Sequence, residues 1–163
     1  MATRSRSSRP WRGADVGASY ASVVAEPLDA ARILAESVSP GDGAALLFWG
    51  VVRNENDGRA VTQLEYHAYE AMAEREILRI ADEARERWAT GDIHVVHRVG
   101  LLQVGEASIA IAVAAPHRGE AYEASRYVIE QIKQRVPIWK REGYTEGENE
   151  WVPGFAPVMG AEE

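Results

Sequence analysis

Residues 107–141 read ASIAIAVAAPHRGEAYEASRYVIEQIKQRVPIWKR and combine a strand, a long helix and the start of another strand. Residues 107–115 are apolar and rich in β-branched side chains, which favours a strand. Residues 117–135 predict a helix. That helix must end there, because Pro137 disfavours helical geometry at Val136 and cannot donate the next backbone hydrogen bond.

A second long helix is predicted over residues 70–88. Its apolar residues recur at steps of three and four and therefore share one face; they are Ala73, Ile77, Ile80, Ala84 and Trp88. Charged side chains fill the other face. This pattern is typical of a helix that covers one face of a sheet.

Most of the remaining chain predicts strands, bounded by glycine, proline and asparagine. They lie at residues 20–25, 44–53, 60–69, 93–99, 138–141 and 149–152. A shorter helix is predicted over residues 28–38. The turn at 54–58 joins its flanking strands into a hairpin, and the last two strands form another. Helices packed on a largely antiparallel sheet predict an α+β fold with two long covering helices.

The composition excludes several classes of protein. The chain has 163 residues, 46% of them hydrophobic, and no cysteine, which fits one globular domain without disulfides, thiolate metal sites or a cysteine nucleophile. Its longest apolar run, residues 44–52, is shorter than the roughly 18 residues that a membrane span needs. Residues 1–10 lack the apolar core of a secretion signal. We therefore expect a cytoplasmic protein without membrane contact.

The charges are distributed unevenly along the chain. Residues 1–12 hold four arginines and no acidic residue, whereas the other 151 residues carry 14 basic and 25 acidic side chains. A body this acidic repels a phosphate backbone, so no nucleic-acid partner is expected. We expect a disordered Arg/Ser-rich tail at 1–18, one domain at 19–155 and a C-terminal tail at 156–163.

Lysine occurs only twice, at Lys133 and Lys140, whereas 16 positions carry arginine. A lysine amine can lose its proton and act as a base or nucleophile, which arginine cannot. The two positions therefore predict chemistry, and chance in an arginine-rich chain is the alternative. Lys133 follows Ile129 on the apolar face of its helix, so its stem should lie at the edge of the core. Pro137 redirects the chain before Lys140, and the two amines can converge on one pocket.

His117 and Arg118 stand at the predicted start of a helix, where the macrodipole favours carboxylates over cations. A bound phosphate would resolve this conflict, because it would meet free backbone N–H groups, an imidazole and a guanidinium together. The alternative is that His117 merely caps the helix and Arg118 pairs with Glu120 or Glu123. Both interpretations are open at this point.

Arg53 ends an apolar strand just where a turn begins, which is a natural position for a ligand of a bound anion. The alternative, which is the commoner case, is an exposed charge that merely ends the strand. The remaining histidines have no metal-ligand spacing, so no metal site is predicted. Neither a phosphate-binding glycine loop nor a dinucleotide fingerprint is present.

Several motifs occur together in a fixed order, from about Tyr20 to Val152: residues 48–54 (FWGVVRN), 64–66 (LEY), 97–100 (HRVG), 104–106 (VGE), 116–118 (PHR) and 133–142 (KQRVPIWKRE). In this order and spacing they resemble the large, catalytic subunit of molybdopterin synthase, the MoaE family. The resemblance implies an α/β-hammerhead type of α+β fold for the domain at 19–155. It also implies a homodimer within a heterotetramer, with a small ubiquitin-like sulfur-carrier subunit at each end.

Members of that family convert cyclic pyranopterin monophosphate into molybdopterin by installing two dithiolene sulfurs. The resemblance implies that the sulfur comes from the carrier's C-terminal Gly-Gly thiocarboxylate and that the enzyme itself holds no cofactor. It assigns catalytic roles to Lys133, beside the thiocarboxylate, and to Lys140. The substrate-binding positions that it implies are Val51, Val52, Arg53, His117, Arg118, Lys133, Lys140, Arg141 and Glu142.

One position departs from the family pattern. Some members carry a basic residue just past the Trp-Val pair that reaches the neighbouring subunit's pocket, whereas here Pro153 and Gly154 follow Trp151 and Val152.

The resemblance predicts that Lys133 acts as a general acid/base, or transiently holds the spent carrier acyl group, while the thiocarboxylate sulfur attacks the pterin side chain. Two alternatives come from other classes. A non-catalytic module that binds a phosphorylated ligand or a ubiquitin-like tail would tolerate arginine in place of either lysine. A Schiff-base enzyme would be trapped by borohydride with its substrate and would need no carrier.

Overall fold

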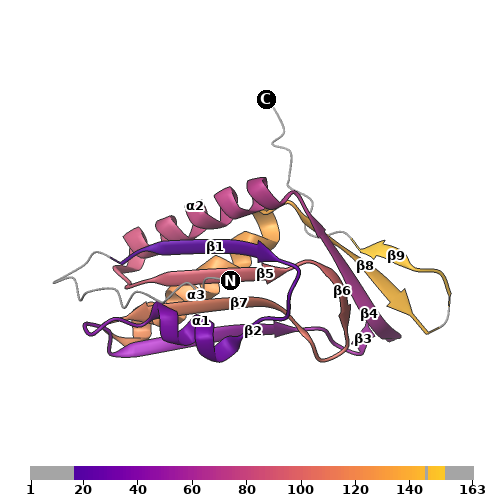
Figure 1. Cartoon of the computed structure of the whole chain (residues 1–163), viewed down its shortest axis with the longest axis horizontal. Coiled ribbons are helices and arrows are strands. Elements are labelled where there is room, and N and C mark those ends of the chain that lie inside the picture. Colours follow the sequence, from indigo (N-terminus) through magenta and orange to yellow (C-terminus); the bar gives the residue numbers. More distant parts are fainter. Residues whose placement is uncertain (1–16, 146, 153–163) are drawn as a thin grey trace, which may run out of the picture.

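The structure is a computed structural model that describes residues 17–145 and 147–152. The expected N-terminal tail, up to residue 16, and the expected C-terminal tail at 156–163 lie outside the described residues. Within the described ranges the strands form two sheets, and helices pack on the first of them (Figure 1).

The first sheet has the strand order β1-β5-β7-β2. Its strands are β1 (Ser19–Val24), β5 (Ile93–Arg98), β7 (Ala107–Ala115) and β2 (Ala44–Val51). The pair β1 and β5 is parallel, whereas β7 runs antiparallel to both β5 and β2. Every residue of β7 is buried, which explains why this segment is apolar on both of its faces.

Two long helices, α2 (Glu70–Trp88) and α3 (Arg118–Arg135), cover one face of the first sheet. Side chains of α2 and α3 pack there against Ile109, Ile111 and Val113 of β7. The other face of β7 presents Ala110 and Ala112 to α1 (Ala30–Ser37), a short helix on the opposite side. The alternation follows from the period of two in a strand.

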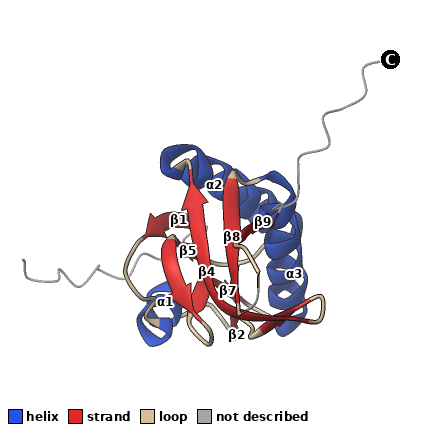
Figure 2. Cartoon of the chain, turned by 90° about the vertical axis from the view of Figure 1, so that its right-hand side faces the viewer, coloured by secondary structure: helices blue, strands red, loops and turns tan. Residues whose placement is uncertain are grey.

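The second sheet lies at one end of the first and faces the viewer in Figure 2. It runs β3-β4-β8-β9, and β6 also pairs with β4. Its strands are β3 (Glu55–Asn56), β4 (Arg59–Ala68), β6 (Gly100–Gln103), β8 (Ile138–Tyr144) and β9 (Glu150–Val152). A small core of Val52, Val61, Leu64 and Leu102 closes one face of this sheet.

The predicted α+β fold, with mostly antiparallel strands and two long covering helices, is confirmed. The predicted hairpin between residues 44–53 and 60–69 is wrong. β2 pairs with β7 in the first sheet, and β4 belongs to the second. The chain leaves the first sheet at Val52, whose backbone bonds to Gly105 and Glu106, and the tight hairpin instead joins β3 to β4.

Two short strands, β3 and β6, were not predicted, because neither is long enough to show a hydrophobic period. The helix α3 ends at Arg135 and is followed by extended backbone at Val136, as Pro137 requires. No helix among the described residues is long and apolar enough to cross a membrane.

Candidate active site

A pocket of about 390 Å³ opens where the two sheets meet the C-terminal end of α3. Its wall is built from the ends of β2 and β7, the last turns of α3, and the inner faces of β4 and β8. Of the residues predicted for the site, those that line it are Val51, Arg53, Lys133, Lys140 and Glu142. The two lysines of the chain therefore share one cavity, although they come from a helix and a strand.

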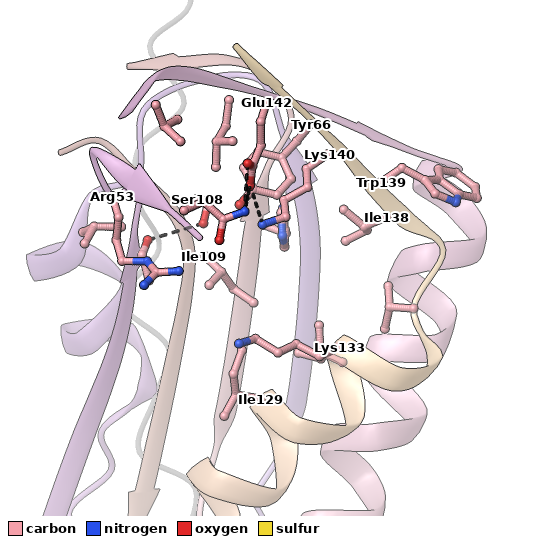
Figure 3. A pocket seen from close by; sticks show the side chains of 18 of the residues that line it. Arg53, Tyr66, Ser108, Ile109, Ile129, Lys133, Ile138, Trp139, Lys140 and Glu142 are labelled. Atoms are coloured by element: carbon pink, nitrogen blue, oxygen red, sulfur yellow. Dashed lines mark hydrogen bonds and ion pairs between the residues drawn. The ribbon is translucent and has the colours of Figure 1, made fainter. Parts of the chain in front are cut away.

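Lys133 projects from the last turn of α3, four residues after Ile129, which also lines the pocket. Its side chain is exposed, and Figure 3 shows its amine directed into the same space that Arg53 and Lys140 border. Lys133 has no ion-pair partner among the described residues.

Lys140 enters the pocket from β8 and makes an ion pair with Glu142, with Nζ 3.1 Å from Oε1. The two residues are two positions apart, so strand geometry places them on the same face. The Glu142 side chain is only 2% exposed. It also accepts hydrogen bonds from Tyr144 Oη, at 2.6 Å, and from Asn56 Nδ2, at 2.9 Å to the nearer oxygen.

These contacts determine the ionisation of the buried carboxyl group. Burial raises the pKa of Glu142, but the hydrogen bonds from Tyr144, Asn56 and Lys140 and the charge of Lys140 outweigh it, and the net pKa is lowered. The hydrogen bond to Glu142 raises the pKa of the Tyr144 hydroxyl. Glu142 therefore stays an anion, and Tyr144 stays a donor, at neutral pH.

Arg53 follows β2 and lies at the lip of the pocket, as its place at the end of an apolar strand predicts. Its side chain is exposed and makes no ion pair with any described residue. A guanidinium without a carboxylate partner at the edge of a cavity is suited to bind a phosphate or carboxylate of a ligand.

Two of the predicted site residues face away from this cavity. Val52 is buried in the small core of the second sheet, with 2% of its surface exposed. Arg141 alternates with Lys140 and Glu142 along β8, so it points to the opposite face of the sheet, where it pairs with Glu65. Neither residue lines the pocket, although the neighbours of each in the sequence do.

His117 and Arg118 lie at the opposite end of α3 from Lys133. Fifteen residues of helix separate Arg118 from Lys133, a rise of about 22 Å. Both side chains are exposed, His117 makes no side-chain capping hydrogen bond, and Arg118 makes no ion pair with Glu120, Glu123 or another described residue. His117 thus occupies the N-cap position of α3, as the capping alternative holds, but the pairing of Arg118 that this alternative includes is not found among the described residues. Neither residue lines the pocket of its own chain.

His97 lines the pocket and was missed as a site residue by the sequence analysis. It is 6% exposed, its ring lies edge-on to Tyr66 at 5.2 Å, and its Nδ1 lies 2.9 Å from the carbonyl oxygen of Arg98. Burial lowers its pKa to about 4, against a raising effect of the Arg98 carbonyl. Both His97 and Tyr66 belong to quoted motifs, which is the signal that could have identified them.

The fold and the pocket together define a class of protein. It is an α+β protein with a pocket that presents Arg53, Lys133 and Lys140 in an otherwise acidic chain, and that holds a neutral imidazole and a buried carboxylate beside them. Such a pocket suits an anionic ligand and proton transfer by amines.

Comparisons with known proteins identify the family. The sequence model for MoaE protein matches residues 23–135. The molybdopterin synthase catalytic subunit of Halalkalibacterium halodurans is 39% identical over 150 residues, which cover 86% of this chain and 96% of that protein. The chain belongs to the MoaE protein family.

Solved structures agree with this assignment. The crystal structure of molybdopterin synthase from Staphylococcus aureus is similar with a TM-score of 0.77 and 39% identity, covering 81% of this chain and 96% of that one. A complex of subunits 1 and 2 of the molybdopterin-converting factor from Helicobacter pylori has a TM-score of 0.66 at 22% identity, over 80% and 88% of the chains. This second likeness concerns the fold.

Proposed function

We propose that this chain is the catalytic subunit of a cytoplasmic molybdopterin synthase, which transfers sulfur from a thiocarboxylated ubiquitin-like carrier to cyclic pyranopterin monophosphate. The observation that carries the proposal is that Lys133 and Lys140, the two lysines of the chain, open on one pocket in a member of the MoaE family. Relatives carry the name molybdopterin synthase catalytic subunit.

The pocket supports the pterin as substrate by its size and charge. A cavity of about 390 Å³ falls in the range that holds a small molecule. Arg53 makes no ion pair with any described residue and can bind the cyclic phosphate, and the neutral His97 and the Tyr66 ring give the pocket an aromatic, weakly polar wall. In this proposal the phosphate lies toward Arg53 and the pterin side chain lies between the two amines.

The carrier subunit is proposed as the sulfur donor because this chain contains no cysteine. A Gly-Gly tail has no side chains and can therefore reach into the pocket beside the exposed amine of Lys133. The thiocarboxylate is an anion, so Lys133 attracts it and is placed to move a proton as the sulfur attacks the pterin. In the covalent version, the attack leaves the carrier acyl group as a thioester on the new pterin sulfur. The Lys133 amine then attacks the thioester carbonyl, the acyl C–S bond breaks so that the sulfur stays on the pterin, and water later releases the carrier carboxylate from Lys133.

His117 and Arg118 fit the same proposal only in a homodimer. The length of α3 keeps them from the pocket of their own chain, yet their exposed cationic side chains at a helix N-terminus suit a phosphate. We propose that each copy places them at the pocket of the other copy. This arrangement would account for the lack of an ion pair at Arg118 and of a side-chain capping bond at His117 among the described residues.

A reconstitution experiment tests the proposed activity. Purified protein is incubated with a thiocarboxylated carrier and cyclic pyranopterin monophosphate, and the dithiolene product is measured. We expect product with the full-length carrier and none with a carrier that lacks its last two glycines. If neither preparation gives product while the protein still binds the pterin phosphate, the non-catalytic binding module is the better account.

A further inference from the structure

The carboxylate of Glu142 joins two segments of the chain, β3 and β8, at the wall of the pocket. Asn56 reaches it from β3, Lys140 and Tyr144 reach it from β8, and the four side chains form one hydrogen-bonded cluster. Figure 3 shows the amine of Lys140 directed toward Glu142. Asn56 and Glu142 are 86 residues apart in sequence, so this contact exists only in the folded chain.

A carboxylate with 2% exposure needs donors for its oxygens, because an ionised group without them is costly to bury. Lys140 alone supplies one bond, at 3.1 Å to Oε1. Tyr144 binds Oε2, and Asn56 Nδ2 lies within bonding distance of both oxygens. Asn56 and Tyr144 therefore provide the contacts that keep Glu142 ionised while Lys140 projects into the cavity.

The two donors are themselves fixed in place. The guanidinium of Arg59 lies 3.6 Å from the centre of the Tyr144 ring and pairs with Glu150 at 3.0 Å. Asn56 sits beside the tight turn that joins β3 to β4, three residues after Arg53. The contact from Asn56 to Glu142 thus also ties the segment that carries Arg53 to the strand that carries Lys140.

We propose that Asn56 and Tyr144 are positioning residues, which act through the Glu142 carboxylate to hold the Lys140 ammonium at its place in the pocket. The catalytic meaning of that position rests on the proposed function. The positioning itself concerns only contacts within this chain, so it is tested separately from the activity.

The chain offers a direct readout, because it has only two lysines. Trace acetylation with acetic anhydride, followed by mass spectrometry, gives separate rates for Lys133 and Lys140 in one sample. Acetylation requires an amine that can turn to meet the reagent, and the hydrogen bond to Glu142 holds the Lys140 amine 3.1 Å from Oε1. Lys133, which makes no ion pair among the described residues, is the internal control.

The test compares the double variant Asn56→Ala with Tyr144→Phe against Glu142→Gln and the unchanged protein. With both donors gone, burial favours the protonated carboxyl group, and Lys140 loses its anionic partner as it does in Glu142→Gln. We expect the acetylation rate of Lys140 to rise at least about threefold in both variants, with the rate of Lys133 unchanged.

A matched control is Tyr127→Phe, which removes a tyrosine-to-carboxylate bond of 2.7 Å between α3 and α2, away from the Glu142 cluster. It should leave both lysine rates unchanged. An unchanged or slower rate of Lys140 in the double variant would overturn the proposal, because Lys140 alone would then sustain the Glu142 carboxylate. Equal increases for both lysines would also overturn it, since general loosening of the structure would explain them. The single variants Asn56→Ala and Tyr144→Phe apply the same criteria if the double variant does not fold.

The activity assay then links the cluster to the reaction. In the reconstituted system Tyr144→Phe should lower kcat by about tenfold, the effect of a misplaced proton-transfer group, with a smaller change in KM. Failure of the unchanged protein to make product would reject the proposed function and leave the acetylation result to decide the positioning role. A raised Lys140 acetylation rate with normal kcat would show that the position of this amine is not catalytic.

Discussion

At the scale of single residues, the chemistry of the pocket depends on which cations keep a free head group. Lys140 is held by Glu142, whereas Lys133 and Arg53 have no ion-pair partner among the described residues. A paired amine is suited to fixed electrostatic stabilisation, and an unpaired one is free to contact incoming groups. This division favours Lys133 as the residue that meets the carrier tail.

The first prediction concerns Lys133→Arg. This change keeps the charge but removes the titratable amine, so we expect product formation to fall at least ~10²-fold, as for loss of a general acid/base. Binding of the carrier, measured by titration calorimetry, should stay close to that of the unchanged protein. Near-normal turnover would remove Lys133 from the catalytic step and favour a purely electrostatic role.

His97 gives a prediction about pH. Its pKa is about 4 in the folded protein, below the ordinary value of 6.5, because burial disfavours the charged ring. As the pH falls below 6.5 the unfolded chain takes up a proton that the folded chain does not, so stability is lost between about pH 6.5 and pH 4.

We therefore expect the titration of His97 to lower the free energy of unfolding by about 2 kcal/mol between pH 7 and pH 5. Urea denaturation of the unchanged protein and of His97→Gln at both pH values measures it. Between pH 7 and pH 5, the unfolding free energy of His97→Gln should fall by about 2 kcal/mol less than that of the unchanged protein. Equal losses in the two proteins would show that His97 is not held neutral by burial.

At the scale of secondary-structure elements, the second sheet depends on the tight turn between β3 and β4. Asp57 and Gly58 both have positive φ, at 49° and 75°, which is the geometry of a two-residue hairpin turn. This turn sets the place of Asn56 in the Glu142 cluster and follows the segment that carries Arg53. The β3–β4 hairpin is short, but it connects the segment that carries Arg53 to the Glu142 cluster that holds Lys140.

Gly58→Ala tests the importance of this turn. Nothing lies within 4 Å of a Cβ placed at Gly58, so the cost comes only from the left-handed backbone, about 1 kcal/mol of unfolding free energy. Gly41→Ala is the matched control, because Gly41 also has open space but no positive φ. Thermal or urea denaturation should show destabilisation in the first variant and almost none in the second.

At the scale of the whole molecule, α3 separates two groups of cations that the family resemblance assigns to one substrate-binding site. Lys133 lies at its C-terminal end with the pocket, and His117 and Arg118 lie at its N-terminal start. A rigid helix of this length cannot bring its two ends together. The proposed homodimer is the arrangement in which both groups serve one substrate.

Subunit complementation tests this arrangement. We expect Lys133→Ala and Arg118→Ala to be inactive or weak alone, and their mixture, after exchange of subunits, to recover about a quarter of the unchanged activity, because half of the dimers are mixed and each has one intact pocket. If both residues acted in the pocket of one chain, no mixed dimer would have an intact site. If the subunits have exchanged and the mixture still shows no recovery of activity, the proposal that two subunits share each site is contradicted.

Much of the fold was predictable from the sequence, because helices and strands follow local patterns. The apolar steps of α2 and the block at Pro137 act between near neighbours, so both covering helices are confirmed close to their predicted bounds. The hairpin from β2 to β4 was predicted wrongly, because a strand followed by a turn does not reveal which sheet the next strand joins. The opposite orientation of Arg141 relative to Lys140 and Glu142 follows from the period of two along β8, but it was not predicted, because the predicted strand ended at Arg141.

The sequence by itself determined the longer elements, the scarcity of lysine, the family of this protein and the place of His117 and Arg118 at the start of α3. Only the tertiary structure decided which side chains share the pocket: it put Lys133 and Lys140 in one cavity, added Asn56 and His97, and left His117 and Arg118 out of it. Local propensity depends on residues within a few positions. Contacts such as the one from Asn56 to Glu142 depend on sheet register and on the packing of segments far apart in the chain, which no short stretch of sequence contains.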